Sequence, residues 1–264
     1  MIRVAARLAG IVAALLIALP IHLLWRLLRL PSPWPRWYLG TLGWIIGARR
    51  RTVGTPLRRN VVFVANHLSW MDIPILAGRT GSAFVAKAEL RAVPLVGWLC
   101  TLNRTIFVRR EDRMAVTEQI ATLRAALAEA WAITIFPEGT TGDGTQLLPF
   151  KAPLLAVLDP PPPGVLVQPV RIDYGAATRE LAWVGDEPGT AHALRVLRRR
   201  GSFTVTLTFC APFDPAAHGG RKAIAAEARA RIAAAGGMEA AKVDSPTVEP
   251  ANLDSGGVEA AASL

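Results

Sequence analysis

Acidic residues are missing from the beginning of this 264-residue chain, since no aspartate or glutamate occurs before Asp72. Ten arginines lie in that stretch, so the remaining 20 of the 30 basic residues match the 20 acidic ones, and the whole net charge of +10 is N-terminal. The same stretch is the most apolar part of the chain. A basic and apolar segment favours a membrane surface as the partner and argues against a nucleic acid.

Cysteine is also scarce, because Cys100 and Cys210 are the only two and form no Cys-x-x-Cys motif. A disulfide scaffold or a zinc ribbon is therefore not expected. The histidines are His22, His67, His192 and His218. They show no metal-ligand spacing, so no metal site is expected either. Hydrophobic residues make up 52% of the chain and charged residues 19%, which excludes a disordered or fibrous protein.

The longest uncharged apolar run lies in the N-terminal segment, residues 1–50. Leu8–Trp25 spans 18 residues without a charge. As a helix it would reach about 27 Å, which is barely enough to cross a bilayer. No small-x-small cleavage site follows it, so we expect the segment to be retained rather than removed as a signal peptide.

A second apolar segment, Trp34–Gly47, is too short to span a membrane and is rich in aromatic residues, which favour the headgroup level. Prolines are expected to break this whole region into short helices; they are Pro20, Pro31, Pro33 and Pro35. The pattern predicts a membrane-associated helical hairpin. It leaves open a spanning helix, an interfacial hairpin and a hairpin buried against the rest of the protein.

From about Thr52 the sequence alternates between β-branched runs and helical stretches, which is typical of an α/β domain with a mostly parallel sheet flanked by helices. Apolar residues recur at helical spacing over residues 116–131, and an alanine-rich helix is expected over Arg221–Ala235. Residues 51–235 form the predicted domain, and residues 236–264 a disordered acidic tail. The expected strands are Val61–Ala65, Phe84–Val85, Ile106–Val108, Ile133–Phe136, Leu166–Ile172 and Phe203–Phe209.

A possible acid–base pair follows the first of these strands, where Asn66 and His67 come five or six residues before Asp72. Residues five apart on a helix point about 140° away from each other, so His67 and Asp72 meet only if His67 lies in the turn before a helix that carries Asp72. An aspartate on one imidazole nitrogen fixes the tautomer and supports the charge formed when the other nitrogen takes a proton. The pair alone fits a general base or a satisfied turn.

Two other segments carry candidate contacts. Phe136–Thr145 is rich in glycine and hydroxyl residues, so its backbone N–H groups suit an anion or an ordinary turn. No Walker lysine follows Gly144, so an ATP site is not expected. Arg110 ends the short strand that begins after Arg104, and its guanidinium fits a phosphate headgroup or a solvated position.

Together and in this order, these segments resemble the lysophospholipid acyltransferase superfamily, the bacterial 1-acylglycerol-3-phosphate (PlsC-like) acyltransferases in particular. The family's His-x4-Asp block is similar to Asn66–Asp72, and its Phe-Pro-Glu-Gly-Thr block is present as Phe136–Thr140. Its Val-x-Pro-Val block resembles Val167–Val170. The resemblance covers about residues 50–210 and implies the family's α/β fold.

The resemblance implies a membrane-bound enzyme that moves a fatty acyl group from acyl-CoA or acyl carrier protein to the free hydroxyl of a lysophospholipid. His67 would be the general base and Asp72 would hold its ring, in a direct transfer without an acyl-enzyme. No cofactor or metal is implied. The residues implied in substrate binding are Asn66, Arg110, Glu138, Gly139, Thr140 and Pro169.

The first acceptor implied is 1-acyl-sn-glycerol-3-phosphate, which would give phosphatidate. Lyso-ornithine lipid is the alternative, because Arg104 replaces the glycine that begins the family's second block and the loop up to Lys151 is similar to that branch. The implied location is the cytoplasmic face of a bacterial inner membrane, with membrane lipids as partners. Rivals from other classes are a lipid-surface binding protein and a hydrolase using Ser69, although the chain has no Gly-x-Ser-x-Gly motif.

Overall fold

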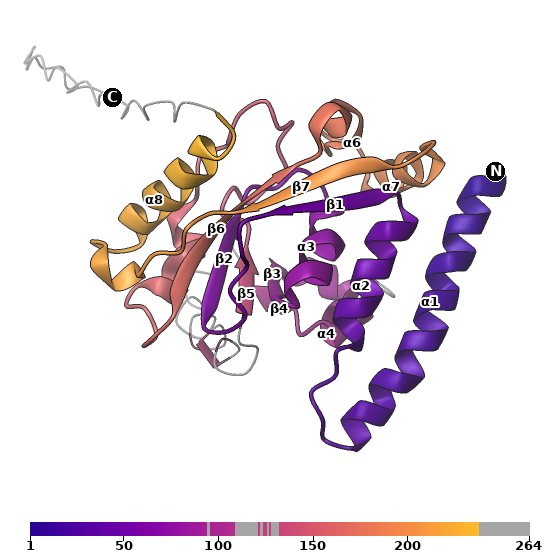
Figure 1. The fold of residues 1–264 in the computed structure, drawn as a ribbon, viewed down its shortest axis with the longest axis horizontal. Coiled ribbons are helices and arrows are strands. Elements are labelled where there is room, and N and C mark those ends of the chain that lie inside the picture. The colour runs from indigo at the N-terminus through magenta and orange to yellow at the C-terminus, as the bar shows by residue number, and fades with distance from the viewer. Residues whose placement is uncertain (94–95, 109–120, 122–123, 126, 128–131, 238–264) are drawn as a thin grey trace, which may run out of the picture.

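Two helices precede an α/β domain in the computed structural model, which describes residues 1–93, 96–108, 121, 124–125, 127 and 132–237. Helices α1 (Ile2–Leu27) and α2 (Trp34–Ile45) form a hairpin at one side of the molecule (Figure 1). The α/β class with an N-terminal helical hairpin, predicted from the sequence, is confirmed.

The domain is built on a seven-stranded sheet with the order β1-β7-β6-β2-β5-β3-β4. Neighbouring described strands run parallel except for β6 and β7, which are antiparallel. The central strands are continuous apolar runs because helices cover both of their faces. The bounds are β1 (Ala48–Val53), β2 (Val61–Ala65), β3 (Ala83–Lys87), β4 (Ile106–Val108), β5 (Ala132–Ile135), β6 (Leu166–Asp173) and β7 (Phe203–Phe209).

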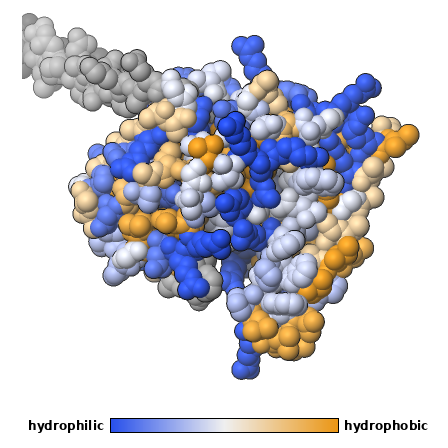
Figure 2. All heavy atoms as spheres, in the orientation of Figure 1, coloured by the Kyte–Doolittle hydropathy of each residue, from blue (hydrophilic) through white to orange (hydrophobic). Residues whose placement is uncertain are grey.

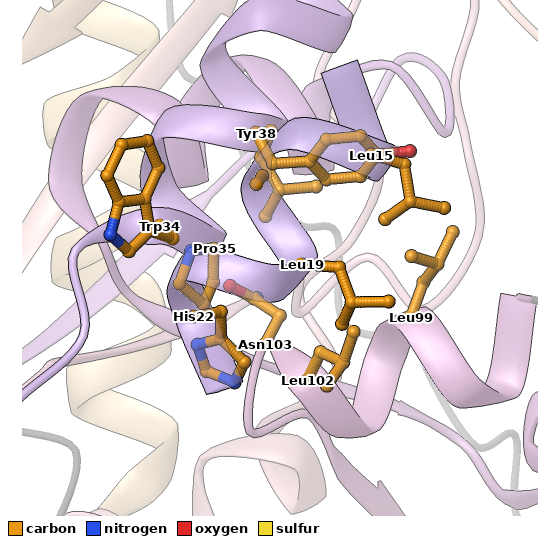
Figure 3. A pocket seen from close by; sticks show the side chains of 11 residues that line it. Leu15, Leu19, His22, Trp34, Pro35, Tyr38, Leu99, Leu102 and Asn103 are labelled. Carbon is orange, nitrogen blue, oxygen red and sulfur yellow. The ribbon is translucent and has the colours of Figure 1, made fainter. Parts of the chain in front are cut away.

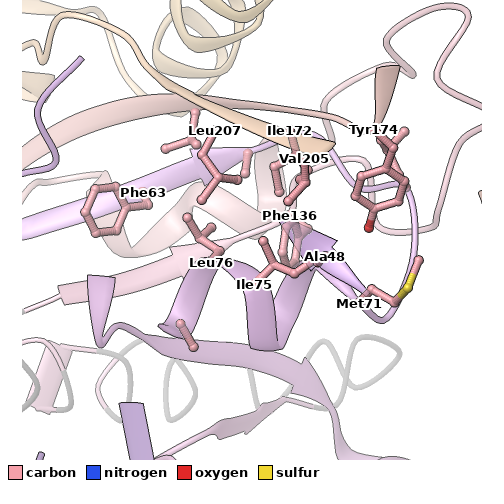
Figure 4. Packing of buried hydrophobic residues seen from close by; sticks show 14 of the residues in the cluster. Ala48, Phe63, Met71, Ile75, Leu76, Phe136, Ile172, Tyr174, Val205 and Leu207 are labelled. Atoms are coloured by element: carbon pink, nitrogen blue, oxygen red, sulfur yellow. The ribbon is translucent and has the colours of Figure 1, made fainter. Parts of the chain in front are cut away.

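Two apolar cores lie on opposite faces of the sheet, because successive strand residues point to opposite sides. Phe63 of β2 packs with α3 (Asp72–Thr80) on the face toward the hairpin, while Val62 and Val64 pack on the face covered by α8 (Arg221–Ala234). Figure 4 shows the first core. The other helices among the described residues are α4 (Val96–Leu102), α6 (Thr178–Leu181) and α7 (Gly189–Arg198), with short 3-10 turns at Ala88–Ala92, Ala152–Leu158, Gly175–Ala177 and Pro215–Ala217.

Glycine lets the hairpin pack closely on the domain. Helix α2 lies against α3, and Gly40 of α2 faces Gly78 of α3. A Cβ atom added to Gly78 would overlap the backbone of Gly40 and touch the guanidinium of Arg50. The two helix backbones therefore approach each other without intervening side chains, which couples the hairpin to the helix that carries Asp72.

We expect Gly78→Ala to destabilise the protein by about 2 kcal/mol, because the added methyl group overpacks the contact between α2 and α3. Thermal denaturation in detergent measures the effect. Gly219→Ala is the matched control, since a Cβ there meets open space. Equal melting temperatures for Gly78→Ala and the unmodified chain would contradict this packing.

An apolar band runs along α1. Among the described residues, one helix is long and apolar enough to cross a membrane, and it is Ile2–Leu27. Its outward side chains include Leu16, Ile17 and Leu27, and the turn after it exposes Leu28 and Leu30. In Figure 2 the hydrophobic colouring continues down this edge to the tip of the hairpin. The hairpin thus buries one side against the domain and leaves an apolar side exposed.

The sequence predicts that proline breaks the first helix, and this prediction is wrong. Pro20 lies inside α1, which continues without interruption to Leu27. Pro20 has no N–H for the carbonyl of Leu16, so one backbone hydrogen bond is lost, but long apolar helices tolerate such a loss. Pro31 and Pro33 do lie in the turn between the helices, and Pro35 lies in the first turn of α2.

The sequence pattern also does not predict β1, and the domain boundary drawn at residue 50 falls inside this strand. Five of the six residues of β1 are exposed, and three are arginines, so the strand has no apolar alternation. It forms because its backbone pairs along one edge with β7. The helical pattern over residues 116–131 and the predicted tail, residues 236–264, lie largely outside the described residues.

Candidate active site

The turn that follows β2 is fixed by the side chain of Asn66. Its amide donates to the carbonyl of Ile172 at 3.0 Å and accepts from the N–H of the same residue at 2.7 Å. These bonds imitate a β-sheet pairing and fasten the end of β2 to β6. The N–H of Gly142 donates to the carbonyl of His67 at 2.8 Å, so the glycine-rich loop holds the turn from its other side.

His67 and Asp72 have the geometry that the sequence predicts. His67 lies in the turn, Asp72 is the first residue of α3, and Nδ1 of His67 is 2.8 Å from Oδ2 of Asp72. The ring of His67 stacks on Phe136 with centroids 4.1 Å apart, and its side chain is 17% exposed. With the Nδ1 proton directed to the carboxylate, Nε2 is the ring nitrogen left to accept a proton.

Asp72 is completely buried and accepts four hydrogen bonds. Besides His67, the N–H groups of Leu68 and Ser69 donate to Oδ2 at 2.7 and 3.0 Å. The hydroxyl of Tyr174 donates to Oδ1. A buried carboxylate with this many donors is compensated for the loss of water and is held in one orientation. The imidazole of His67 is therefore preorganised.

Tyr174 is a site residue that the sequence pattern does not reveal. It directly follows β6 and is buried. Its hydroxyl binds Oδ1 of Asp72, the carboxylate oxygen that His67 does not contact. Burial, followed by the charge of Asp72, raises the pKa of Tyr174 well above its ordinary value, so the hydroxyl keeps its proton and donates. Figure 4 shows its hydroxyl group at the edge of the core near Met71. Its role is to position Asp72.

We expect Tyr174→Phe to lower kcat about tenfold with little change in KM, because one hydrogen bond to the ionised carboxylate is lost while the packing is kept. Tyr38→Phe is the matched control, since Tyr38 belongs to the hairpin. An unchanged kcat, or a raised KM with a normal kcat, would contradict a positioning role.

Glu138 is the other buried carboxyl group at the site, with 3% exposure. Burial raises its pKa to about 8, and the nearby Asp72 adds to this, although the N–H groups of His67 and Leu148 act in the opposite direction. Glu138 is therefore mainly protonated at neutral pH. Gly139 follows with a φ of +73°, and Thr140 is exposed, so the loop turns outward directly after Glu138.

The proton on Glu138 makes stability depend on pH. The folded pKa is about 8 against an ordinary value of 4.5. Between these values the unfolded chain loses a proton that the folded chain keeps, so the free energy of unfolding falls as pH rises from 4.5 to 8, by at most about 1.4 kcal/mol per pH unit. Glu138→Gln is neutral at every pH and should lack this contribution.

Thermal denaturation at pH 5 and pH 8 measures the difference. The melting temperature of Glu138→Gln relative to the unmodified chain should rise from pH 5 to pH 8. Glu89→Gln, at an exposed position, should show no such trend. The same offset at both pH values for Glu138→Gln would show that Glu138 is ionised in the folded protein.

The chain resembles known acyltransferases over the part that builds this turn. Residues 49–173 match the family model described as Acyltransferase. The lyso-ornithine lipid O-acyltransferase of Brucella abortus (strain 2308) is 33% identical over 256 residues, which cover 88% of this chain and 93% of the relative. The chain belongs to the lysophospholipid acyltransferase family.

Two further comparisons agree with this assignment. The lyso-ornithine lipid O-acyltransferase of Pseudomonas aeruginosa (PAO1) is 37% identical over 179 residues, covering 65% of this chain and 67% of that protein. The crystal structure of the 1-acyl-sn-glycerophosphate acyltransferase PlsC from Thermotoga maritima superposes with a TM-score of 0.58 at 26% identity, covering 86% of this chain and 92% of that one. The protein is an acyltransferase, and the predicted PlsC-like superfamily is confirmed.

The structure brings only some of the predicted substrate-binding residues of this acyltransferase to the turn. Asn66 directly precedes His67, but its side chain is occupied by β6. Glu138 accepts from the N–H of His67, and Gly139 and Thr140 follow it in the loop whose Gly142 bonds to His67. Pro169 is not brought there, because it is buried within β6 in register with Val64. Arg110 lies outside the described residues, so its role as a headgroup contact stays a prediction.

Arg104, which stands where the family's second block begins with glycine, has a φ of +57°. This is the left-handed region that glycine adopts without strain and other residues adopt at a cost. The backbone turn before β4 has therefore the conformation that suits a glycine, and this acyltransferase forms it with arginine.

A polar pocket opens beside Asn66 and Glu138. Arg171 and Asp173 of β6 bring groups of opposite charge to its wall, and Gln146 of the glycine-rich loop adds an amide. Because Asn66 precedes His67 directly, this pocket adjoins the turn that carries the acid–base pair. A wall with both signs of charge suits a ligand that also has both.

Proposed function

We propose that this acyltransferase transfers a fatty acyl group from acyl-CoA or acyl carrier protein to the free hydroxyl of lyso-ornithine lipid. The observation that carries the proposal is the hydrogen bond between Nδ1 of His67 and Asp72, which leaves Nε2 free to take a proton. As Nε2 removes the proton of the acceptor hydroxyl, the hydroxyl oxygen attacks the thioester carbonyl. The C–S bond then breaks, and the leaving thiolate takes the proton from His67.

No covalent acyl-enzyme forms in this proposal. Ser69 is completely buried, and its Oγ accepts a hydrogen bond from the N–H of Met71 at 3.3 Å. A nucleophilic hydroxyl has to reach the thioester, so a fully buried serine is unsuited to the hydrolase alternative. The acyl donor is a co-substrate, and no metal or other cofactor takes part in the transfer.

Two observations support lyso-ornithine lipid over 1-acyl-sn-glycerol-3-phosphate as the acceptor. Two relatives named for lyso-ornithine lipid match 65% and 88% of the chain. An ornithine headgroup with a free carboxylate and a free ammonium also suits a pocket wall that contains both Arg171 and Asp173. The match to PlsC keeps 1-acyl-sn-glycerol-3-phosphate as the second candidate.

The proposed place of action is the cytoplasmic face of a bacterial inner membrane. The apolar band on α1 and the arginines around the hairpin support insertion of the hairpin into a leaflet that contains anionic lipids. The close contact of α2 with α3 would then hold His67 near the lipid surface. Lipid acceptors would reach the site by lateral diffusion, without crossing water.

Acyl transfer to the two acceptors side by side tests this function. The detergent-purified full chain is given a labelled acyl thioester with lyso-ornithine lipid or with lysophosphatidic acid. The proposal predicts product mainly from lyso-ornithine lipid. Product mainly from lysophosphatidic acid would overturn the choice of acceptor and place the enzyme in phosphatidate synthesis, while no transfer to either would overturn the proposed function.

A further inference from the structure

A second pocket lies between the hairpin and α4, away from the polar pocket beside His67, with which it shares no lining residue. Figure 3 shows its wall, which is mostly apolar and includes Leu15 and Leu19 of α1, Tyr38 of α2, and Leu99 and Leu102 of α4. About 380 Å³ of space free of protein atoms lies within the pocket and at its open mouth, solvent included. The proposed function does not use this pocket.

Three nitrogen atoms of this wall have no hydrogen-bond partner. They are Nε2 of His22, Nε1 of Trp34 and Nδ2 of Asn103, and in the described part of the chain they are all the buried side-chain polar atoms found without a partner. His22 is only 8% exposed. Buried polar groups in folded proteins are almost always paired, so three unpaired ones in a single pocket indicate a ligand that pairs them.

Two of these nitrogens, in Trp34 and Asn103, carry N–H groups that only donate. Nδ1 of His22 lies 2.8 Å from Oγ of Ser32, which also accepts from the backbone N–H of Trp34. When Nδ1 accepts the proton of Ser32, Nε2 of His22 carries the ring proton and is a third donor. The matching ligand therefore presents oxygen acceptors beside apolar chains.

The charge around the pocket is positive. The charges of Arg26 and Arg104 act on the ring of His22. Neither arginine forms an ion pair within the described residues, and no carboxylate occurs before Asp72. An anionic ligand would gain from both charges, whereas a cation would be repelled.

The surface near the pocket is the lower part of the apolar band on α1. Leu23, Leu24 and Leu27 are 54%, 48% and 79% exposed, and they lie within about one and a half helical turns after the pocket residue His22. In the membrane-inserted state of the proposed function, on which this step rests, these side chains contact lipid. A lipid of the same leaflet then reaches the pocket without crossing water.

We propose that this pocket binds one anionic phospholipid of the surrounding leaflet. An acyl chain packs against the leucines of α1 and α4, and phosphate or ester oxygens accept from His22, Trp34 and Asn103. Arg26 and Arg104 balance the phosphate charge. Because the pocket joins the hairpin to α4, the bound lipid ties the membrane-inserted helices to the segment that leads into β4.

Native mass spectrometry of the purified full chain with phosphatidylglycerol tests the proposal. The unmodified chain should retain one phosphatidylglycerol molecule and melt at a higher temperature with it. The double variant Trp34→Phe, Asn103→Leu should bind at least about tenfold more weakly, since two donors are removed. Trp37→Phe, an exposed tryptophan of the same helix, is the matched control and should bind normally. Equal retention by the double variant would overturn the proposal.

Asn103→Leu alone loses one unpaired donor and keeps about the same side-chain volume, so its lipid-free form should melt no lower than the unmodified chain. A lower melting temperature would show that the side-chain donor stabilises the lipid-free protein, and would overturn the proposal. Phosphatidylcholine tests the charge and should bind more weakly. Inorganic phosphate tests the headgroup alone and should not raise the melting temperature; if it does so as well as the lipid, the site binds free phosphate instead.

Competition separates this site from the catalytic one. Lyso-ornithine lipid and the acyl thioester should not displace phosphatidylglycerol; displacement by either would identify the pocket as a substrate site and overturn the proposal. The same binding measurement on His67→Ala should give an unchanged result. Phosphatidylglycerol binding without any acyl transfer would thus support the lipid site and contradict the proposed function.

Discussion

His67→Ala should lower acyl transfer by about 10³-fold while leaving the fold intact, because it removes the nitrogen that takes the proton of the acceptor hydroxyl. The ring is 17% exposed and contacts the rest of the protein mainly through Asp72 and Phe136, so its loss leaves only a small gap near the surface. Initial rates with labelled acyl thioester, together with the melting temperature, measure both parts of this prediction.

His218→Ala is the matched control for this variant. His218 contacts Asp214 and Phe213 and takes no part in the turn after β2. Its replacement should leave the rate unchanged. A rate within tenfold of the unmodified enzyme for His67→Ala would mean that another group removes the proton, and the proposed role of His67 as the base would be wrong.

Asp72→Asn should also cause a large loss, of about 10³-fold in kcat, with a smaller effect on KM. The asparagine oxygen can replace Oδ2 and accept from Leu68 and Ser69, while its NH2 group faces the oxygen of Tyr174, which can accept. The fold is therefore expected to persist. What is lost is the negative charge that supports the imidazolium in the transition state.

Steady-state kinetics on Asp72→Asn and on the control Asp186→Asn distinguish these effects. Asp186 is exposed in the loop before α7, and its substitution should have no effect. An unchanged kcat for Asp72→Asn would remove Asp72 from the mechanism. A raised KM with normal kcat would instead indicate that Asp72 shapes the acceptor site.

The pairing of His67 with Asp72 is predictable from the sequence because it is local. Five residues separate the two, and the strand before them and the helix after them leave a single arrangement in which they meet. Five of the six expected strands follow in the same way from apolar runs, which are typical of strands covered on both faces. Phe203–Phe209 follows instead from its alternation of apolar residues with threonine. Most of the fold is predictable from such local patterns.

Features that depend on distant contacts are not predictable in this way. Tyr174 reaches Asp72 across 102 residues of sequence, and Asn66 bonds Ile172 across 106. Nothing around Tyr174 marks it as a partner of a carboxylate, and no local pattern predicts that the side chain of Asn66 pairs with β6. The arginine-rich β1 likewise exists only through its pairing with β7.

A single-turnover experiment tests direct transfer with His67 as the base. The full chain, in excess over a labelled acyl thioester, is mixed with lyso-ornithine lipid, and label on protein and on lipid is followed over time. We expect label to pass to the lipid without appearing on the protein, and His67→Ala to form no labelled lipid in the same interval. Label that appears on the protein first, or transfer that continues without His67, would contradict this mechanism.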